Sequence, residues 1–309
     1  MVPLSLSTSW NSNRHRDGEP MLTEIAELGF IAAELGHGIR YSLVPGLLKA
    51  VEGGVIRISS VHNFCPVPLG VSRPSPNCFL FSDPHPELRR AAVRHTLETL
   101  RFAERVHAPA VVLHLGHGGP DGITPRLERA YELGKIYGRA ATRAKVAAVA
   151  RRRREFDLIY GRVRQCLEAL VPAAVERGIR LGFEIREDYA EFPDEIEMDR
   201  LLADFAPTVA GYWHDFGHAA RKDFLGWHDH AATFSRRVAE GRLLGCHIHD
   251  CSPPDHDHRA VGDGEIDFAH LAPLIPQEAI RVLELSPRVG RDDVIKSKAT
   301  WSSFAATSV

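Results

Sequence analysis

Histidine and carboxylate side chains recur directly after short apolar runs of this chain, which has 17 histidines in 309 residues. The residues at these positions are His62, His114, Glu184, Asp215, His218, His247, His249 and Glu284. Imidazole nitrogens and carboxylate oxygens without thiolates are the ligands of manganese, magnesium, cobalt or zinc. The first hypothesis is therefore a divalent metal site, with the metal left open.

The spacing of these residues indicates which of them can bind the metal together, but it does not decide between His247 and His249. His247 and His249 are two residues apart, so on a strand both side chains point to the same face and either can bind the metal. Asp215 and His218 are three apart at an expected strand-to-helix turn. One of that pair can therefore bind metal while the other contacts substrate.

A second group of polar residues follows at Asp255-His256-Asp257-His258-Arg259. Its acids and histidines could hold a second metal, and Arg259 could help to bind an anionic group of a substrate. Glu187, three residues after Glu184, is a further candidate for orienting substrate hydroxyls. Asp257 and His258 are the candidate ligands in this segment.

The elements that must position these side chains are short strands alternating with amphipathic helices. The predicted strands are Val2 to Ser7, Phe30 to Leu35, Val55 to Val61, Ala110 to Leu115, Arg180 to Ile185, Thr208 to Trp213, Leu243 to Ile248 and Ile280 to Leu285. Helical periodicity marks Met21 to Leu28, Leu43 to Val51, Glu87 to Val106, Asp157 to Arg177, Glu195 to Phe205, Ala231 to Glu240 and Phe268 to Leu274.

Eight strand-helix units predict an α/β fold, a (β/α)8 TIM barrel, in which every strand end points at one shared pocket. An open doubly wound sheet would need a glycine-rich phosphate turn, and the sequence has none. We expect one domain over residues 1–309, with a core at about 4–287 and a loosely packed tail at 288–309. A Pro-rich loop from Cys65 to Pro86 could wall the site, and a helical insert from Gly118 to Arg177 separates strands four and five. The insert's basic run, Arg151 to Arg154, is expected on a solvated helix face.

Charge and cysteine content exclude several partners. The 38 Lys and Arg against 40 Asp and Glu give a net charge of −2, which leaves no field to attract nucleic acid or an anionic membrane. No apolar run approaches the roughly 20 residues that span a bilayer. Five cysteines without a CxxC pair suit a reducing compartment, so a cytoplasmic protein is expected.

With these residues assembled, the chain resembles the xylose isomerase-like TIM-barrel superfamily over about residues 4 to 287. The group it is most similar to is the sugar phosphate isomerases and epimerases, which includes tagatose and psicose 3-epimerases, with endonuclease IV as a relative. The resemblance is carried by the strand ending in Glu184, the Asp215-Phe-Gly-His218 turn, the His247-Ile-His249-Asp250 stretch with its Gly-Asp-Gly-Glu-Ile-Asp continuation, and Glu284.

The resemblance implies ligands for one divalent ion. The epimerases imply Glu184, Asp215, His249 and Glu284, whereas the endonuclease implies His247 in place of His249. The endonuclease's further zinc ligands match His62, His114, His218 and His258, so a second or third metal is open. In the endonuclease an Asp lies two residues before the last of these ligands. The corresponding residue here is His256, which puts a trinuclear cluster in doubt.

The function that this resemblance implies is sugar or sugar phosphate isomerisation or epimerisation in carbohydrate metabolism. A metal would stabilise an enediolate while Glu184 and Glu284 act as the acid/base pair. The alternatives are a metal-dependent dehydratase or lyase on a keto-sugar or inosose, and an endonuclease IV-like zinc phosphodiesterase. The expected partner is a small carbohydrate, with no nucleic acid and no membrane, and association into a homo-oligomer is compatible with the resemblance.

Overall fold

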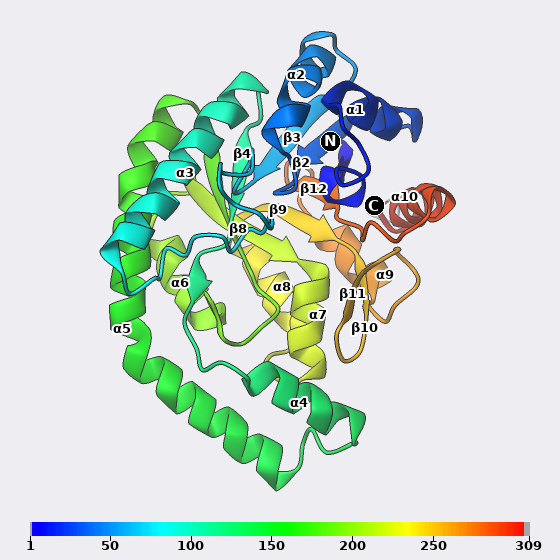
Figure 1. Ribbon diagram of the computed structural model, residues 1–309. Coiled ribbons are helices and arrows are strands. Elements are labelled where there is room, and N and C mark those ends of the chain that lie inside the picture. The colour runs from blue at the N-terminus through cyan, green and yellow to red at the C-terminus, as the bar shows by residue number, and fades with distance from the viewer. Residues whose placement is uncertain (1, 306–309) are drawn as a thin grey trace.

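The computed structural model describes residues 2–305 and folds as a closed barrel of eight parallel strands (Figure 1). Around the barrel the strand order is β1-β12-β9-β8-β6-β4-β3-β2, and β1 also pairs with β2 to close it. The strands are β1 (Leu4–Ser7), β2 (Ala32–Leu35), β3 (Arg57–His62), β4 (Ala110–Leu113), β6 (Arg180–Glu184), β8 (Ala210–Asp215), β9 (Leu243–Ile248) and β12 (Ile280–Leu283). The predicted (β/α)8 TIM barrel is confirmed.

Helices surround the barrel and bury its outer face (Figure 1). They are α1 (Gly18–Glu27), α2 (Val44–Glu52), α3 (Pro86–Arg105), α4 (Ile123–Glu132), α5 (Arg139–Glu176), α6 (Glu195–Asp204), α7 (Phe216–Phe224), α8 (His230–Ala239), α9 (Phe268–Leu271) and α10 (Arg291–Ala305). Two small antiparallel sheets lie outside the barrel: β5 (Gly116–His117) with β7 (Glu191–Phe192), and β10 (Asp250–Ser252) with β11 (His256–Arg259).

The sixth barrel strand ends later than its sequence predicted. Strand β8 runs to Asp215 rather than ending at Trp213, and α7 begins at the next residue. The Asp215 carboxylate accepts a hydrogen bond from the His218 amide at 2.8 Å and so caps that helix. Asp215 is therefore held at the junction of a barrel strand and a helix.

An indole fills the barrel interior. Trp213 is fully buried, and its ring lies against the backbone of Gly182 on β6 and Gly245 on β9. A Cβ atom at Gly182 would lie 2.8 Å from the ring, and one at Gly245 only 2.5 Å from it. These two glycines are needed for that close approach, and His247 lies above with its ring centroid 5.3 Å from the indole.

The helical insert between β4 and β6 is present as expected, and its second helix is longer than predicted. Helix α5 begins at Arg139 rather than near Asp157, because the Ala-rich segment before the basic run continues the helix. The insert's α4 and the adjoining part of α5 extend away from the barrel (Figure 1) and enclose their own apolar cluster, which includes Leu127 and Ile136.

The basic run lies on an exposed helix face as expected, except at one position. Arg151, Arg153 and Arg154 are exposed, whereas Arg152 is buried and paired with Asp194 and Glu197. In the segment expected to pack loosely, residues 291–305 form α10, whose Trp301 is buried against Phe268. The remaining residues, 306–309, lie outside the described part of the chain.

Among the described residues, no helix combines the length and apolarity that crossing a membrane requires.

Candidate metal centre

Four side chains predicted as ligands meet at the carboxyl end of the barrel. Glu184 and Asp215 end β6 and β8, His247 lies in β9, and Glu284 directly follows β12. The His247 Nδ1 atom lies 3.4 Å from Glu184 Oε1, 3.6 Å from Asp215 Oδ2 and 3.3 Å from Glu284 Oε2. Three carboxylates from three strands thus surround one imidazole nitrogen.

The other nitrogen of His247 is fixed by a residue that sequence reasoning missed. His247 Nε2 lies 3.2 Å from both oxygens of Glu34, which is fully buried on β2. The Ser7 and Ser60 hydroxyls also donate to Glu34, at 3.1 and 2.8 Å. Since the Glu34 carboxylate can only accept, His247 donates from Nε2, and its Nδ1 is the atom that faces the three carboxylates.

This Nδ1 atom is buried and makes no hydrogen bond with any described residue. Three carboxylates around one buried nitrogen need a positive charge between them, which either a proton on the ring or a bound metal ion supplies. Histidine held by a carboxylate on its far nitrogen is also the usual arrangement of a metal ligand. The donor set around His247 therefore fits a divalent ion.

The neighbouring His249 has both nitrogens engaged. Its Nδ1 accepts a hydrogen bond from the His258 amide at 2.8 Å, so Nε2 carries the proton and donates to Asp215, 2.9 Å from Oδ1. The ring packs onto the backbone of Gly217, where any Cβ would clash with it. In this arrangement His249 orients Asp215 and offers no free lone pair.

His62 and His114 approach the opposite oxygen of Glu184. Their Nε2 atoms lie 3.1 and 2.9 Å from Glu184 Oε2. Their Nδ1 atoms face carbonyl oxygens of Asn63 and Asn77, each at 2.9 Å, which orients both rings. The burial of His114, together with nearby Arg186, lowers its pKa to about 3, so this ring is neutral near pH 7.

A third group lies beside the first, toward α7. His218 Nε2 is 3.4 Å from Glu187, and Arg221 bridges Glu187 and Asp257 at 2.6 and 3.0 Å. The His258 ring stacks on His249, and its Nδ1 lies 3.0 Å from the Glu284 carbonyl oxygen. The acid and histidine segment after β9 is thus brought to the site, except that His256 is exposed and pairs with Asp255.

Arg186 is a second residue that sequence reasoning missed. Its guanidinium lies 3.2 Å from Glu184 Oε1 and 3.2 Å from Glu191, and it is buried. It also lies 3.1 Å from His218 Nδ1. Arg186 therefore donates to one oxygen of Glu184, while the Nε2 atoms of His62 and His114 face the other.

The three central carboxylates are ionised at neutral pH. Burial raises the pKa of Glu184, but His114 and Arg186 outweigh it and hold that pKa well below its ordinary value. Burial likewise opposes ionisation of Asp215, whose pKa neighbouring histidines hold far below normal. For Glu284, His247 and other histidines overcome burial and lower the pKa to about 2. The site is a concentrated negative charge.

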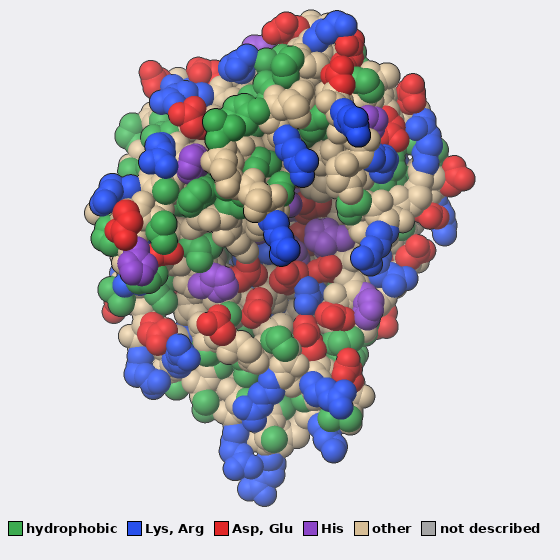
Figure 2. Space-filling model, viewed as in Figure 1, with side chains coloured by type: hydrophobic (Ala, Val, Ile, Leu, Met, Phe, Trp, Pro, Cys, Tyr) green, Lys and Arg blue, Asp and Glu red, His purple; other side chains and the backbone are tan. Residues whose placement is uncertain are grey.

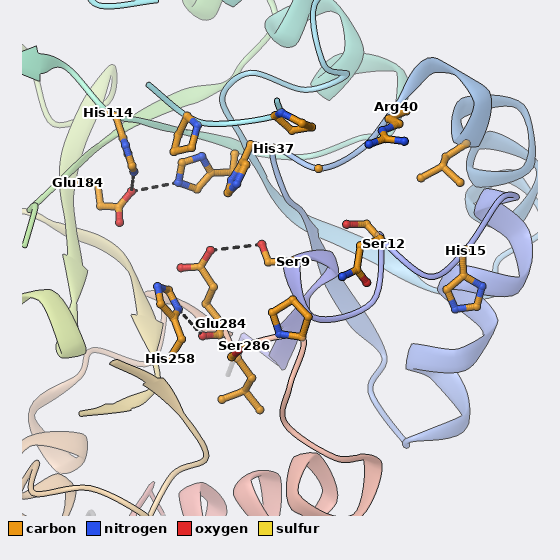
Figure 3. Close-up of a pocket in the computed structure, with 18 of the residues that line it drawn as sticks. Ser9, Ser12, His15, His37, Arg40, His114, Glu184, His258, Glu284 and Ser286 are labelled. Carbon is orange, nitrogen blue, oxygen red and sulfur yellow. Dashed lines mark hydrogen bonds and ion pairs between the residues drawn. The ribbon is translucent and has the colours of Figure 1, made fainter. Parts of the chain in front are cut away.

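A cavity of about 770 Å³ opens above this centre (Figure 3). The predicted site residues that line it are His62, His114, Glu184, Glu187, His218, His258 and Glu284. Asp215, His247 and His249 lie beneath the lining and are fully buried. Asp257 and Arg259 do not line it, so neither faces the cavity as the sequence suggested for a substrate contact. Pro74 and Pro76 show that the Pro-rich loop does wall the site.

One missed residue had a readable signal in the sequence. Glu34 is the only charged residue in the run Phe30 to Leu35, and an acid inside an apolar strand must find a buried partner. Arg186 gave no such signal, because it lies in a polar segment after its strand.

Comparisons with known proteins agree with this architecture. A family model described as xylose isomerase-like TIM barrel matches residues 22–301. Among curated proteins no significant match is found.

Solved structures similar to this chain include a D-tagatose 3-epimerase-like protein, at 15% identity and a TM-score of 0.71 over 99% of this chain and 98% of that one. The 3-keto-D-glucoside 4-epimerase of E. coli is 13% identical, with a TM-score of 0.66 over 98% and 100%. A D-psicose 3-epimerase crystallised with D-fructose is 12% identical, with a TM-score of 0.64 over 98% and 99%.

Proposed function

This chain belongs to the xylose isomerase-like TIM barrel family, and we propose that it is a divalent-metal-dependent sugar isomerase or epimerase. The observation that carries this proposal is the buried Nδ1 atom of His247, which makes no hydrogen bond and lies among three ionised carboxylates. The similarity to a D-tagatose 3-epimerase-like protein, a 3-keto-D-glucoside 4-epimerase and a D-psicose 3-epimerase supports the substrate class.

The ligands we propose are Glu184, Asp215, His247 and Glu284. We choose His247 over His249 because His247 Nδ1 faces the three carboxylates without a hydrogen bond, whereas both nitrogens of His249 are engaged. We assign His249 to orienting Asp215, and Glu34 to orienting His247. When bound, a divalent ion would stabilise the negative charge that develops on two adjacent substrate oxygens during enediolisation.

Two of these carboxylates can also reach the substrate. Glu184 and Glu284 line the cavity, whereas Asp215 does not. They come from β6 and β12, which are separated in the barrel by β9 and β8. A sugar between them would have one carboxylate on each side, so one removes the proton next to the carbonyl and the other returns it.

The surroundings of the two carboxylates differ in a way that suits this division. Arg186 donates to one oxygen of Glu184, and the Nε2 atoms of His62 and His114 lie beside the other. Glu284 has a weaker contact, with the Ser9 hydroxyl at 3.4 Å from Oε1. We propose that His62, His114, His218 and His258, which also line the cavity, contact substrate hydroxyls together with Glu187.

Proton exchange with solvent tests this reaction directly. The protein would be loaded in turn with manganese, cobalt, magnesium or zinc and incubated in D2O with D-tagatose, D-psicose, D-fructose, L-ribulose and their phosphates. Proton NMR should show deuterium entering at the carbon next to the carbonyl, with formation of an epimer or aldose, and EDTA should abolish it. A dehydrated product without an epimer would instead indicate a lyase. The absence of exchange in every ketose by metal-loaded protein would refute the proposal.

A further inference from the structure

The cavity extends well beyond the metal centre. Figure 3 shows Glu184, His114, Glu284 and His258 at one end, and Arg40, Ser12 and His15 at the other. The far end is built from the segments that follow β1 and β2. Its lining side chains are Ser12, Asn13, His15, Arg16, Arg40 and Ser42. Every one of these can donate a hydrogen bond, and none is a carboxylate.

Two of these cations have no partner. Arg186 at the metal end is paired with Glu184 and Glu191, and His15 at the far end is paired with Glu24 at 2.7 Å. The guanidinium groups of Arg16 and Arg40, by contrast, make no hydrogen bond or ion pair with any residue in the described part of the chain. They are exposed at the mouth, where Figure 2 shows Lys and Arg side chains beside a hollow whose depth holds acidic and histidine side chains.

The segments that carry the two arginines are fixed against each other. A Cβ at Gly38, two residues before Arg40, would lie 2.7 Å from the Ser12 hydroxyl. The Asp17 carboxylate, next to Arg16, caps α1 by accepting from the Glu19 amide at 3.0 Å. Helices α1 and α2, which begin just after these segments, pack together. The two guanidiniums therefore extend from a rigid base, which lowers the cost of ordering them around a ligand.

We propose that this far end binds a phosphate monoester carried by the substrate at the end opposite the reacting carbons. A planar carboxylate is satisfied by one bidentate arginine, whereas a phosphate dianion has three oxygens that accept from several directions. The guanidiniums of Arg16 and Arg40 and the hydroxyls of Ser12 and Ser42 line the same cavity from two segments, and together they supply the several donors that a phosphate requires. The cavity, at about 770 Å³, is large enough for an extended ligand.

This assignment rests on the proposed function for the identity of the reaction but not for the binding of phosphate. At the metal end, the carboxylates of Glu184, Asp215 and Glu284 would be neutralised by the bound ion and by Arg186. The far end supplies surplus positive charge and is left for the substrate to neutralise. A ketose phosphate, neutral at its carbonyl end and dianionic at the other, is complementary to both.

The test compares Arg16→Gln/Arg40→Gln with the wild type and with Arg57→Gln, an exposed arginine at the opposite end of the barrel. Calorimetric titration of inorganic phosphate into the metal-loaded protein should show binding that the double variant weakens about tenfold or more and the control leaves unchanged. Phosphate binding that is absent in the wild type, or equal in the double variant, would overturn the assignment.

Turnover separates this assignment from the proposed reaction. For D-tagatose 6-phosphate or D-fructose 6-phosphate, kcat/KM should exceed that of the parent ketose and fall about 100-fold in the double variant. For the parent ketose, kcat/KM of the double variant should stay within about twofold of the wild-type value. A preference for the carboxylate analogue D-tagaturonate, or an equal loss for both ketoses, would overturn the phosphate site while leaving the reaction intact. Arginine-dependent phosphate binding without any ketose exchange would reject the reaction and keep the site.

Discussion

Two histidine clusters lie on opposite sides of the same barrel wall, and they differ in how their lone pairs are matched. On the outer side, His214 Nδ1 meets the Tyr212 hydroxyl at 2.9 Å and its Nε2 meets His230 Nε2 at 3.0 Å. On the inner side, His247 has one nitrogen on Glu34 and the other without a donor. Asp215 follows His214 in β8, and the alternation of a strand sends these neighbours to opposite faces.

Electrostatics separates the two clusters further. Burial lowers the pKa of His214 well below its usual value, and burial with nearby His228 lowers that of His230 to about 3, so both rings are neutral. Burial opposes protonation of His247 as well, but Glu284 and Glu34 raise its pKa far above normal. The comparison teaches that burial does not identify a functional histidine. An unmatched nitrogen among ionised carboxylates does.

The largest effect should come from removing the base at the inner side. We expect Glu284→Gln to lower turnover by about 10² to 10⁴-fold, because the amide cannot accept a proton, while the barrel remains folded. Rates from deuterium exchange and melting followed by circular dichroism check both parts. Glu278 is exposed just before the same strand. Glu278→Gln is therefore the control, and its turnover should equal that of the wild type. Near-normal turnover in Glu284→Gln would refute the two-carboxylate scheme.

The choice between the two β9 histidines gives the next effect. His247→Gln should weaken metal binding by more than about 100-fold, because a ligand is lost. His249→Gln should weaken it by about 10 to 100-fold, because only the orientation of Asp215 is lost. Competition with a metal-sensitive dye measures both affinities. The reverse order would mean that His249 is the ligand and that the orphaned nitrogen of His247 has another role.

A smaller effect is expected at Glu34, which touches no substrate. Glu34→Gln preserves the volume but removes the charge that holds His247 Nε2, so metal affinity should fall about tenfold, the lower end for such supporting residues. The exposed Glu52→Gln serves as the control for loss of one acid. Unchanged affinity in Glu34→Gln would show that the serines and β2 backbone fix the His247 ring without it.

The smallest effect concerns stability at the outer pair. The pKa of His230 is about 3 in the folded chain against an ordinary 6.5, so below pH 6.5 the unfolded chain binds the proton first. The stability from this group is complete above pH 6.5 and is lost as the pH falls toward 3, by about 1.4 kcal/mol per unit for each such histidine. In urea melts between pH 6.5 and 5, His230→Gln should show a shallower loss than the wild type. An equal loss of unfolding free energy with falling pH in both proteins would contradict the neutral state of the His214 and His230 rings.

Most of the barrel's secondary structure can be predicted from local sequence patterns. Strands buried on both faces appear as short apolar runs, so all eight barrel strands and the ends carrying Glu184 and Glu284 were predictable. Helix α7 was not predicted as a helix of its own, since its nine residues are mostly polar or small. Helix α10 was missed because its burial depends on Phe268 and other residues of the folded barrel.

The ligand choice could not be predicted for a physical reason. Two histidines on one face of a strand are equivalent until their second nitrogens find partners. The partner of His247 is Glu34, which precedes it by 213 positions, and the partner of His249 is the backbone of a later hairpin. Such pairings are set by barrel closure, which brings β2 across from β9, and no local spacing encodes them.

The central claim is that the inner cluster holds a divalent ion, and elemental mass spectrometry of protein purified without added metal tests it most directly. We expect about one manganese, cobalt, magnesium or zinc ion per chain, lost in Glu184→Ala and His247→Gln and retained in His230→Gln. Two or three zinc ions per chain would point to the histidines around Glu184 and His218 as further ligands. A wild-type protein without metal, or with the same content as Glu184→Ala, would contradict the metal centre.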